Sequence, residues 1–251
     1  MLIDAARAEM APLQRRLAAD AGASLCAEFG EIFLRAMLPE RYGVARGRAF
    51  AVDGEPSCAD GVLIFDALHR LPLGDLHPVE LVYALSVAAE FLDLGEFDRQ
   101  LHAVEQFKRM RREKATAYDV TPVHHLRMFG ARYAQLSDDQ INPLLSYVFA
   151  MDAVDPDVIF DSLNDALRRD APRAEHSPDA IFCLRGGWLI ARQTRTGELA
   201  VPRSSFGKFG IYRVGDDVLT WVYLLLNTAL SQIQLRAPDL LKHLQRLSKA
   251  G

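Results

Sequence analysis

The stretch Gly61–Asp66 reads Gly-Val-Leu-Ile-Phe-Asp, a short continuous apolar run that ends in an acid. A half-exposed strand would alternate apolar and polar residues, whereas a strand covered on both faces is apolar throughout. A second apolar run, Val79–Ala88, follows a loop that contains Pro72, Gly74 and Pro78. The two runs therefore predict buried strands of a sheet.

Helical patterns flank these strands on both sides. Apolar residues spaced by three and four predict a helix over Ser24–Leu38, which follows an Ala-rich helix over Met1–Ala23. Further helices are predicted over Glu96–Thr116, over Asp157–Arg168 and, with an interruption near Pro238, over Asp216–Leu247.

The remaining segments are assigned by the same patterns. We expect one or two helices over Ser137–Ala153. Ala180–Arg192 and Glu198–Val201 predict a hairpin-like pair around Thr196-Gly197. The order of helices and strands predicts one mixed α/β domain over residues 1–251, with a central mixed β-sheet flanked by helices. Within it we expect N-terminal helices over 1–38, a core over 39–116 and a helical and hairpin part over 117–251.

Composition narrows the class of protein. The 251 residues are 50% hydrophobic and carry a formal net charge of -4, so the chain as a whole has no basic field for nucleic acid. The cysteines, Cys26, Cys58 and Cys183, form no C-x-x-C pair, which argues against a disulfide framework or a zinc site. Met1–Asp20 lacks the pattern of a signal peptide, and Val218–Leu230 is too short to span a bilayer. We expect a cytoplasmic protein with no membrane partner.

Five short motifs resemble the restriction-endonuclease-like, or PD-(D/E)XK, superfamily, in particular uncharacterised bacterial domains with a nuclease-type core. They are Gly30–Arg35, Leu38–Tyr42, Ser57–Asp60, Val62–Asp66 and Pro78–Ala88. The resemblance covers most of the chain, although the motifs are short. It implies a restriction-endonuclease-like core with extra C-terminal helices.

The resemblance also implies a site. Such domains use a helix Glu, a strand Asp and a following E-x-K, whose carboxylates hold Mg²⁺ and whose Lys stabilises developing charge. Here Glu31 matches the helix Glu and Asp60 the strand Asp, but the E-x-K position falls on Ser86-Val87-Ala88. Serine is a poor Mg²⁺ ligand and alanine offers no ligand. The resemblance therefore implies a degenerate nuclease with a remnant site, in which Asp60 is a weak metal ligand and no cofactor is required.

Two alternatives stand beside this interpretation. Asp60 and Asp66 could be the polar ends of a buried strand and Glu31 an exposed helix residue, with no chemistry at all. Conversely, Glu80 or Glu90 could replace the missing acid, which would make the chain an active Mg²⁺-dependent nuclease.

A basic segment offers a candidate nucleic-acid-binding surface at the end of the charge-rich helix. Its cations are Lys108, Arg109, Arg111, Arg112 and Lys114. Each could contact a phosphate, although cations at a helix C-terminus also suit the helix dipole. The partners considered are nucleic acid and another protein. A third alternative is a structural subunit of a complex, which binds a second copy through the C-terminal helix. By resemblance, the expected setting is phage defence or mobile-element biology.

Overall fold

The computed structural model describes residues 2–19, 29–51, 61–69, 74–112, 143–169, 176–200, 208–233 and 235. The strands are β1 (Tyr42–Phe50), β2 (Gly61–Asp66), β3 (Leu76–Pro78), β4 (Val82–Leu92), β5 (Leu145–Ala153), β6 (Ala180–Cys183), β7 (Trp188–Gln193) and β8 (Lys208–Arg213). They form one sheet in the order β3-β1-β2-β4-β5-β6-β7-β8.

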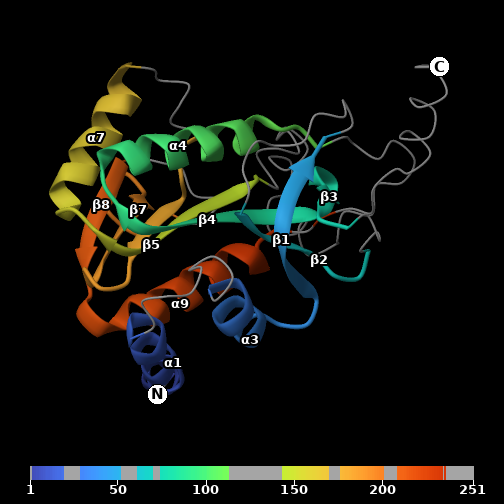
Figure 1. Ribbon diagram of the computed structural model, residues 1–251, viewed down its shortest axis with the longest axis horizontal. Coiled ribbons are helices and arrows are strands. Elements are labelled where there is room, and N and C mark those ends of the chain that lie inside the picture. The colour runs from blue at the N-terminus through green and yellow to red at the C-terminus, as the bar shows by residue number, and fades with distance from the viewer. Residues whose placement is uncertain are drawn as a thin grey trace.

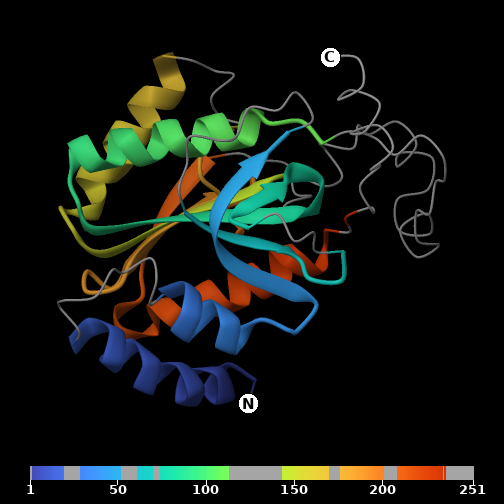
Figure 2. The same ribbon diagram turned by 45° about the vertical axis from the view of Figure 1, so that its right-hand side comes forward.

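Helices cover both faces of this sheet (Figure 1). The α-helices are α1 (Leu2–Ala19), α3 (Arg35–Met37), α4 (Leu94–Arg109), α7 (Pro156–Arg169) and α9 (Val218–Ser231). A π-helical turn, η1 (Phe29–Leu34), leads into α3, while the 3-10 turns η2 (Val79–Leu81) and η3 (Gly215–Asp217) precede β4 and α9. In both ribbon views α4 and α7 lie on one side of the sheet, and α1, α3 and α9 on the other (Figure 2). The predicted fold class, a central mixed sheet flanked by helices, is confirmed.

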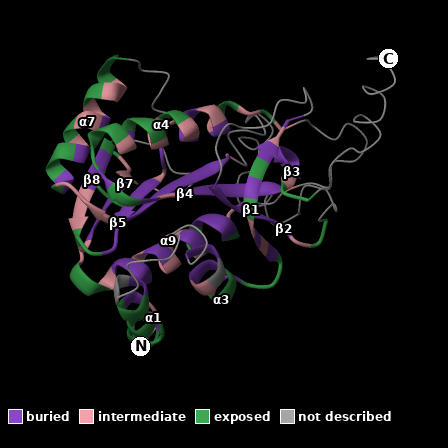
Figure 3. Cartoon of the chain, in the orientation of Figure 1, coloured by how far each residue is buried: buried purple, intermediate pink, exposed green. Residues whose placement is uncertain are grey.

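The middle of the sheet is buried on both faces (Figure 3). All six residues of β2 are buried, as its apolar sequence predicts. β2 pairs antiparallel with β1 and β4, whereas β4, β5 and β6 run parallel. Parallel strands need helical crossovers, and α4 and α7 occupy those positions in the chain. The sheet therefore separates two apolar cores, one under α1, η1 and α9 and the other under α4 and α7.

The prediction of helices over Ser137–Ala153 is wrong for its described part, because β5 occupies Leu145–Ala153. The strand lies between β4 and β6, and its first seven residues are buried. A strand buried on both faces lacks the alternation that distinguishes a strand from a buried helix. Residues 137–142 lie outside the described part of the chain.

The predicted hairpin has a different turn. Ala180–Arg192 contains two strands, β6 and β7, which pair antiparallel across Gly186 and Gly187. Gly187 has a φ of 64°, a conformation that glycine adopts without strain. The expected turn at Gly197 does form, but its two sides are joined only by an isolated β-bridge between Gln193 and Leu199. The second strand that pairs with β7 is β8.

The other helices follow their predictions with different bounds. α4 ends at Arg109, because Met110 has extended backbone angles. α7 confirms the helix expected from Asp157, and α9 occupies the first half of the helix expected from Asp216. Residues 236–247, which include Pro238, lie outside the described residues. In the described part of the chain, no helix is both long and apolar enough to cross a membrane.

Candidate functional site

The E-x-K position lies in the middle of β4. Ser86 pairs with Val62 of β2 on one side and with Tyr147 of β5 on the other. Ala88 pairs with Phe149 and packs against the core under α1, η1 and α9. Because side chains alternate along a strand, Ser86 faces that same core.

An aromatic cluster covers this face of β4. Phe29 of η1 stacks on Phe149 with ring centroids 4.0 Å apart, and Phe33 stacks on Phe29 at 5.4 Å. The π-helical turn lies very close to the sheet, since a Cβ on Gly30 would come within 3.1 Å of the Val62 side chain. Among the described residues, hydrocarbon side chains therefore cover this face of β4, and Ala88 is half-buried.

Ser86 adds no polar function to this environment. Its side chain is 3% exposed, and its hydroxyl oxygen finds no hydrogen-bond partner among the described residues. Mg²⁺ takes oxygen ligands, chiefly carboxylates and waters. No group of three or more histidine, cysteine or acidic residues that could hold a metal occurs in the described part of the chain.

The two residues expected to match nuclease carboxylates, Glu31 and Asp60, are only partly described. Glu31 lies in η1, which packs on this face of the sheet, but its side chain is not among those described. Asp60 lies outside the described residues. The next residue, Gly61, is described and approaches β4 closely, because a Cβ there would lie 2.7 Å from the Ser86 carbonyl oxygen.

The two candidate replacement acids have different positions. Glu80 lies in η2, before the start of β4, and is 4% exposed. Glu90 lies in β4 itself and is exposed. It is two residues beyond Ala88 and therefore on the same face. A site that used Glu90 in place of the missing acid would therefore stay within β4.

The basic segment divides into buried and exposed members. The Lys108 side chain is 5% exposed and forms an ion pair with Asp179. Arg112 donates from its guanidinium to the backbone oxygens of Val79 and Val82. Arg109 and Arg111 are exposed, and Arg109 pairs with Glu105 of the same helix. Lys114 lies outside the described residues. As a surface for phosphates, the segment thus offers Arg109 and Arg111.

A polar cluster that the sequence patterns do not predict lies where β1 begins and β2 ends. The exposed Arg41 places its guanidinium 4.6 Å from the Tyr42 ring centroid. Tyr42 meets Tyr83 edge to face, and Asp66 accepts from the Leu68 amide and contacts His69 Nδ1 at 2.8 Å. Burial, followed by the nearby Asp66 carboxylate, raises the pKa of Tyr83 to about 12. The local signals are the Arg-Tyr pair at 41–42 and the spacing of Asp66 and His69, whereas Tyr83 joins them only in the fold.

Comparisons with known proteins find similarity in structure alone. No family model matches the chain, and no curated protein matches it in sequence. Structures of NucC from P. aeruginosa ATCC27853 and from E. coli MS115-1, both bound to cAAA, superpose on it with a TM-score of 0.69. Each is 15% identical and covers 98% of this chain, which spans 97% and 96% of the respective NucC chains. The apo form of E. coli MS115-1 NucC gives the same score and identity over 96% of this chain. The fold is therefore that of the NucC structures.

Proposed function

We propose that this chain is a nuclease-like protein that binds a partner in phage defence and does not cut by the usual metal-dependent mechanism. The observation that carries the proposal is the hydrocarbon cover over the E-x-K position. Phe29 and Phe149 stack on this face of β4, where the Ser86 hydroxyl has no hydrogen-bond partner within the described part of the chain. A hydrated Mg²⁺ and an attacking water would need polar ligands in that space.

The setting in phage defence rests on the NucC-like fold together with the sequence resemblance. Fold alone does not determine activity, because function depends on the residues of a site. Mg²⁺ is a cofactor only if the chain proves to be an active nuclease. Glu31 and Asp60 would then be the residues that best match the catalytic pattern of the family.

A cleavage assay tests the proposal directly. Purified protein is incubated with plasmid, linear duplex and RNA in Mg²⁺ or Mn²⁺. We expect the wild type to show no more metal-dependent cleavage than the Asp60→Ala variant shows. The matched control is Asp98→Ala, which removes an exposed acid from α4. Cleavage by the wild type and by Asp98→Ala that is lost in Asp60→Ala would overturn the inactive interpretation.

Glu90 gives the active alternative a specific residue. It is exposed, in the same strand and on the same face as Ser86 and Ala88. If the assay detects cleavage, Glu90→Gln should abolish it, while Glu198→Gln at an exposed turn should not. Cleavage that survives Glu90→Gln would exclude Glu90 as the migrated acid.

A nucleotide ligand is a second candidate, because two of the NucC structures contain cAAA. In the described part of this chain, Arg41 combines an exposed guanidinium with an adjacent aromatic ring, a combination suited to phosphate and base. Calorimetric titration with cAAA should give binding that weakens by about tenfold in Arg41→Ala, since one charge-assisted hydrogen bond contributes that much. Arg48→Ala is the control, because Arg48 is a part-exposed arginine of β1. No binding to the wild type would remove this candidate.

Self-association through the C-terminal helix stays a proposal. α9 buries Val222 and Leu226 in the core, and Trp221, Tyr223 and Leu225 pack partly against it. The apolar surface left for a second copy is therefore limited. Light scattering at high protein concentration tests this idea, and a monomer would exclude a dimer formed through α9.

A further inference from the structure

Three charged side chains meet under the last turn of α4. Lys108 Nζ lies 2.8 Å from Asp179 Oδ2, and Arg192 Nε lies 3.3 Å from Asp179 Oδ1. The side chain of Lys108 is 5% exposed, that of Asp179 is 20% exposed and that of Arg192 is 14% exposed. They come from α4, from the residue before β6 and from β7. The fold therefore buries charge where helix and sheet meet.

The single carboxylate of Asp179 serves several donors. Its Oδ2 also accepts from the Ser146 amide at 2.7 Å. Arg192 has further acceptors, since it donates to the Ser177 carbonyl at 2.6 Å and to the Pro178 carbonyl at 3.2 Å. Lys108 and Arg192 thus share one carboxylate, and the cluster carries excess positive charge.

The other titratable and charged groups around Lys108 do little to offset that charge. Glu105, one turn earlier in α4, is paired with Arg109. Tyr147 of β5 is neutral, because burial and then the Asp179 carboxylate raise its pKa well above the usual value. His176 lies in the turn before β6, and its Nδ1 is buried without a hydrogen-bond partner among the described residues.

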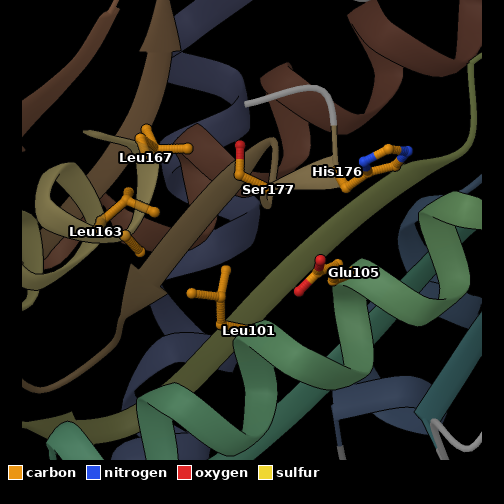
Figure 4. Close-up of a pocket in the computed structure, with 7 residues that line it drawn as sticks. Leu101, Glu105, Leu163, Leu167, His176 and Ser177 are labelled. Atoms are coloured by element: carbon orange, nitrogen blue, oxygen red, sulfur yellow. The ribbon is translucent and has the colours of Figure 1, made fainter. Parts of the chain in front are cut away.

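The cluster adjoins the space between α4 and α7 through Ser177, which accepts from Arg192. A small pocket there is lined by Leu101 and Glu105 of α4, by Leu163 and Leu167 of α7, and by His176 and Ser177 (Figure 4). Removing an ammonium from water into such surroundings is costly unless it is fully compensated. Burial, and secondarily the positive charge of Arg192, lower the pKa of Lys108 from 10.5 to about 8, although Asp179 acts in the opposite direction.

We propose that Lys108 makes the last turn of α4 a proton-sensitive release element, which opens more readily when Lys108 is charged and stays closed when it is neutral. Opening returns the ammonium to water and leaves Asp179 to Arg192 and Ser146. The turn carries Arg109 and leads to Arg112. Arg112 donates hydrogen bonds to the carbonyl oxygens of Val79, which precedes β4, and of Val82, which is the first residue of β4. Release would therefore reposition the exposed basic residues and loosen the entry to β4.

The direction of the pH dependence follows from proton binding. In the opened turn, Lys108 regains the pKa of a solvated lysine, 10.5, whereas in the closed turn it is about 8. Between these values the opened state binds more protons, so raising the pH favours the closed state. Below pH 8 both states are protonated, and the release tendency is at its maximum.

Amide hydrogen exchange, corrected for the intrinsic rate at each pH, tests the proposal. The amides of Phe107, Lys108 and Arg109 in the wild type should gain about tenfold or more in protection between pH 7 and pH 9.5, because each unit of pKa difference corresponds to a tenfold change. Amides of β5, such as Val148 and Phe149, report global unfolding. They should be more protected than the last turn at pH 7.

Variants separate Lys108 from other titrating groups. In the Lys108→Met variant, the amides of the last turn of α4 should be strongly protected at both pH values. In the Lys108→Arg variant, which keeps the positive charge, the same amides should be weakly protected at both pH values. Lys208→Met removes an exposed lysine of β8 and should behave as the wild type. The wild-type profile remains decisive even if a variant fails to fold.

Either of two results would overturn the release element. One is a wild-type last turn whose protection does not rise with pH. The other is a last turn that exchanges only as slowly as β5, which would mean that no local opening occurs. Neither result depends on nucleic-acid binding, so the proposed function would be unaffected.

Discussion

Ser86 places a buried hydroxyl where the nuclease pattern calls for a carboxylate. The hydroxyl oxygen has no hydrogen-bond partner among the described residues, and aromatic rings cover the face on which it lies. A buried unpaired hydroxyl is costly, which makes Ser86 a poorly optimised core residue.

This arrangement predicts that Ser86→Ala stabilises the protein. Removing the unpaired hydroxyl should raise the free energy of unfolding by about 1 kcal/mol, the lower end of the cost of an unsatisfied buried group. Urea denaturation measures the change. Ser177→Ala is the control, because the Ser177 hydroxyl lies 3.0 Å from Arg192 as an acceptor, so its loss should destabilise. A stability loss in Ser86→Ala would show that the hydroxyl has a partner after all.

At the scale of elements, α4 connects the candidate site to the basic segment. It begins directly after β4, and the Asp93 carboxylate caps its first turn by accepting from the Glu96 amide at 2.8 Å. Its inner face buries Phe97, Val104 and Phe107 against the sheet. The first turn is therefore anchored by a cap, whereas the last turn is anchored by a buried charge pair.

The cap predicts a measurable loss of stability. Asp93→Ala should lower the free energy of unfolding by about 1 kcal/mol, because an N-cap side chain satisfies an amide that has no helical partner. Thermal or urea denaturation measures this change. Asp98→Ala, an exposed acid in the second turn of the same helix, should change stability by less than about 0.5 kcal/mol. Equal effects of the two substitutions would argue against a capping role.

For the whole molecule, the net charge of -4 leaves nucleic-acid binding to local cations. Arg109 and Arg111 are the members of the basic segment that the fold leaves exposed. If the protein binds duplex DNA through them, the double variant Arg109→Ala, Arg111→Ala should reduce the salt slope of binding by about 2, because each phosphate that is no longer neutralised lowers the slope by about one unit.

Fluorescence anisotropy across a salt series measures this slope. The control is Arg168→Ala with Arg169→Ala, which removes two exposed cations from the end of α7. A slope that both double variants leave unchanged would show that neither surface contacts phosphates. Arg112→Ala is unsuitable, because it removes the anchor of Val79 and Val82 as well as a charge.

The sequence by itself determined the buried strands and the fold class. The apolar run at Gly61–Asp66 is β2, and the mixed α/β class follows from the order of such segments. The serine and alanine at 86 and 88 are visible in the chain without any structure. These features are local, because an apolar run and the chemistry of a side chain can be identified from neighbouring residues alone.

Only the tertiary structure decided which segments and charges meet. β5 is a strand because β4 and β6 supply its hydrogen bonds, which periodicity in a buried apolar run does not reveal. Lys108 is a buried partner of Asp179 rather than a surface cation, because the packing of α4 on the sheet brings together residues far apart in the chain. The aromatic cover of Ala88 likewise joins η1 to β5. The burial of a side chain and its pairing with distant residues are long-range properties. They change the free energy of holding a charge in the protein, and the neighbouring residues in the sequence do not show this change.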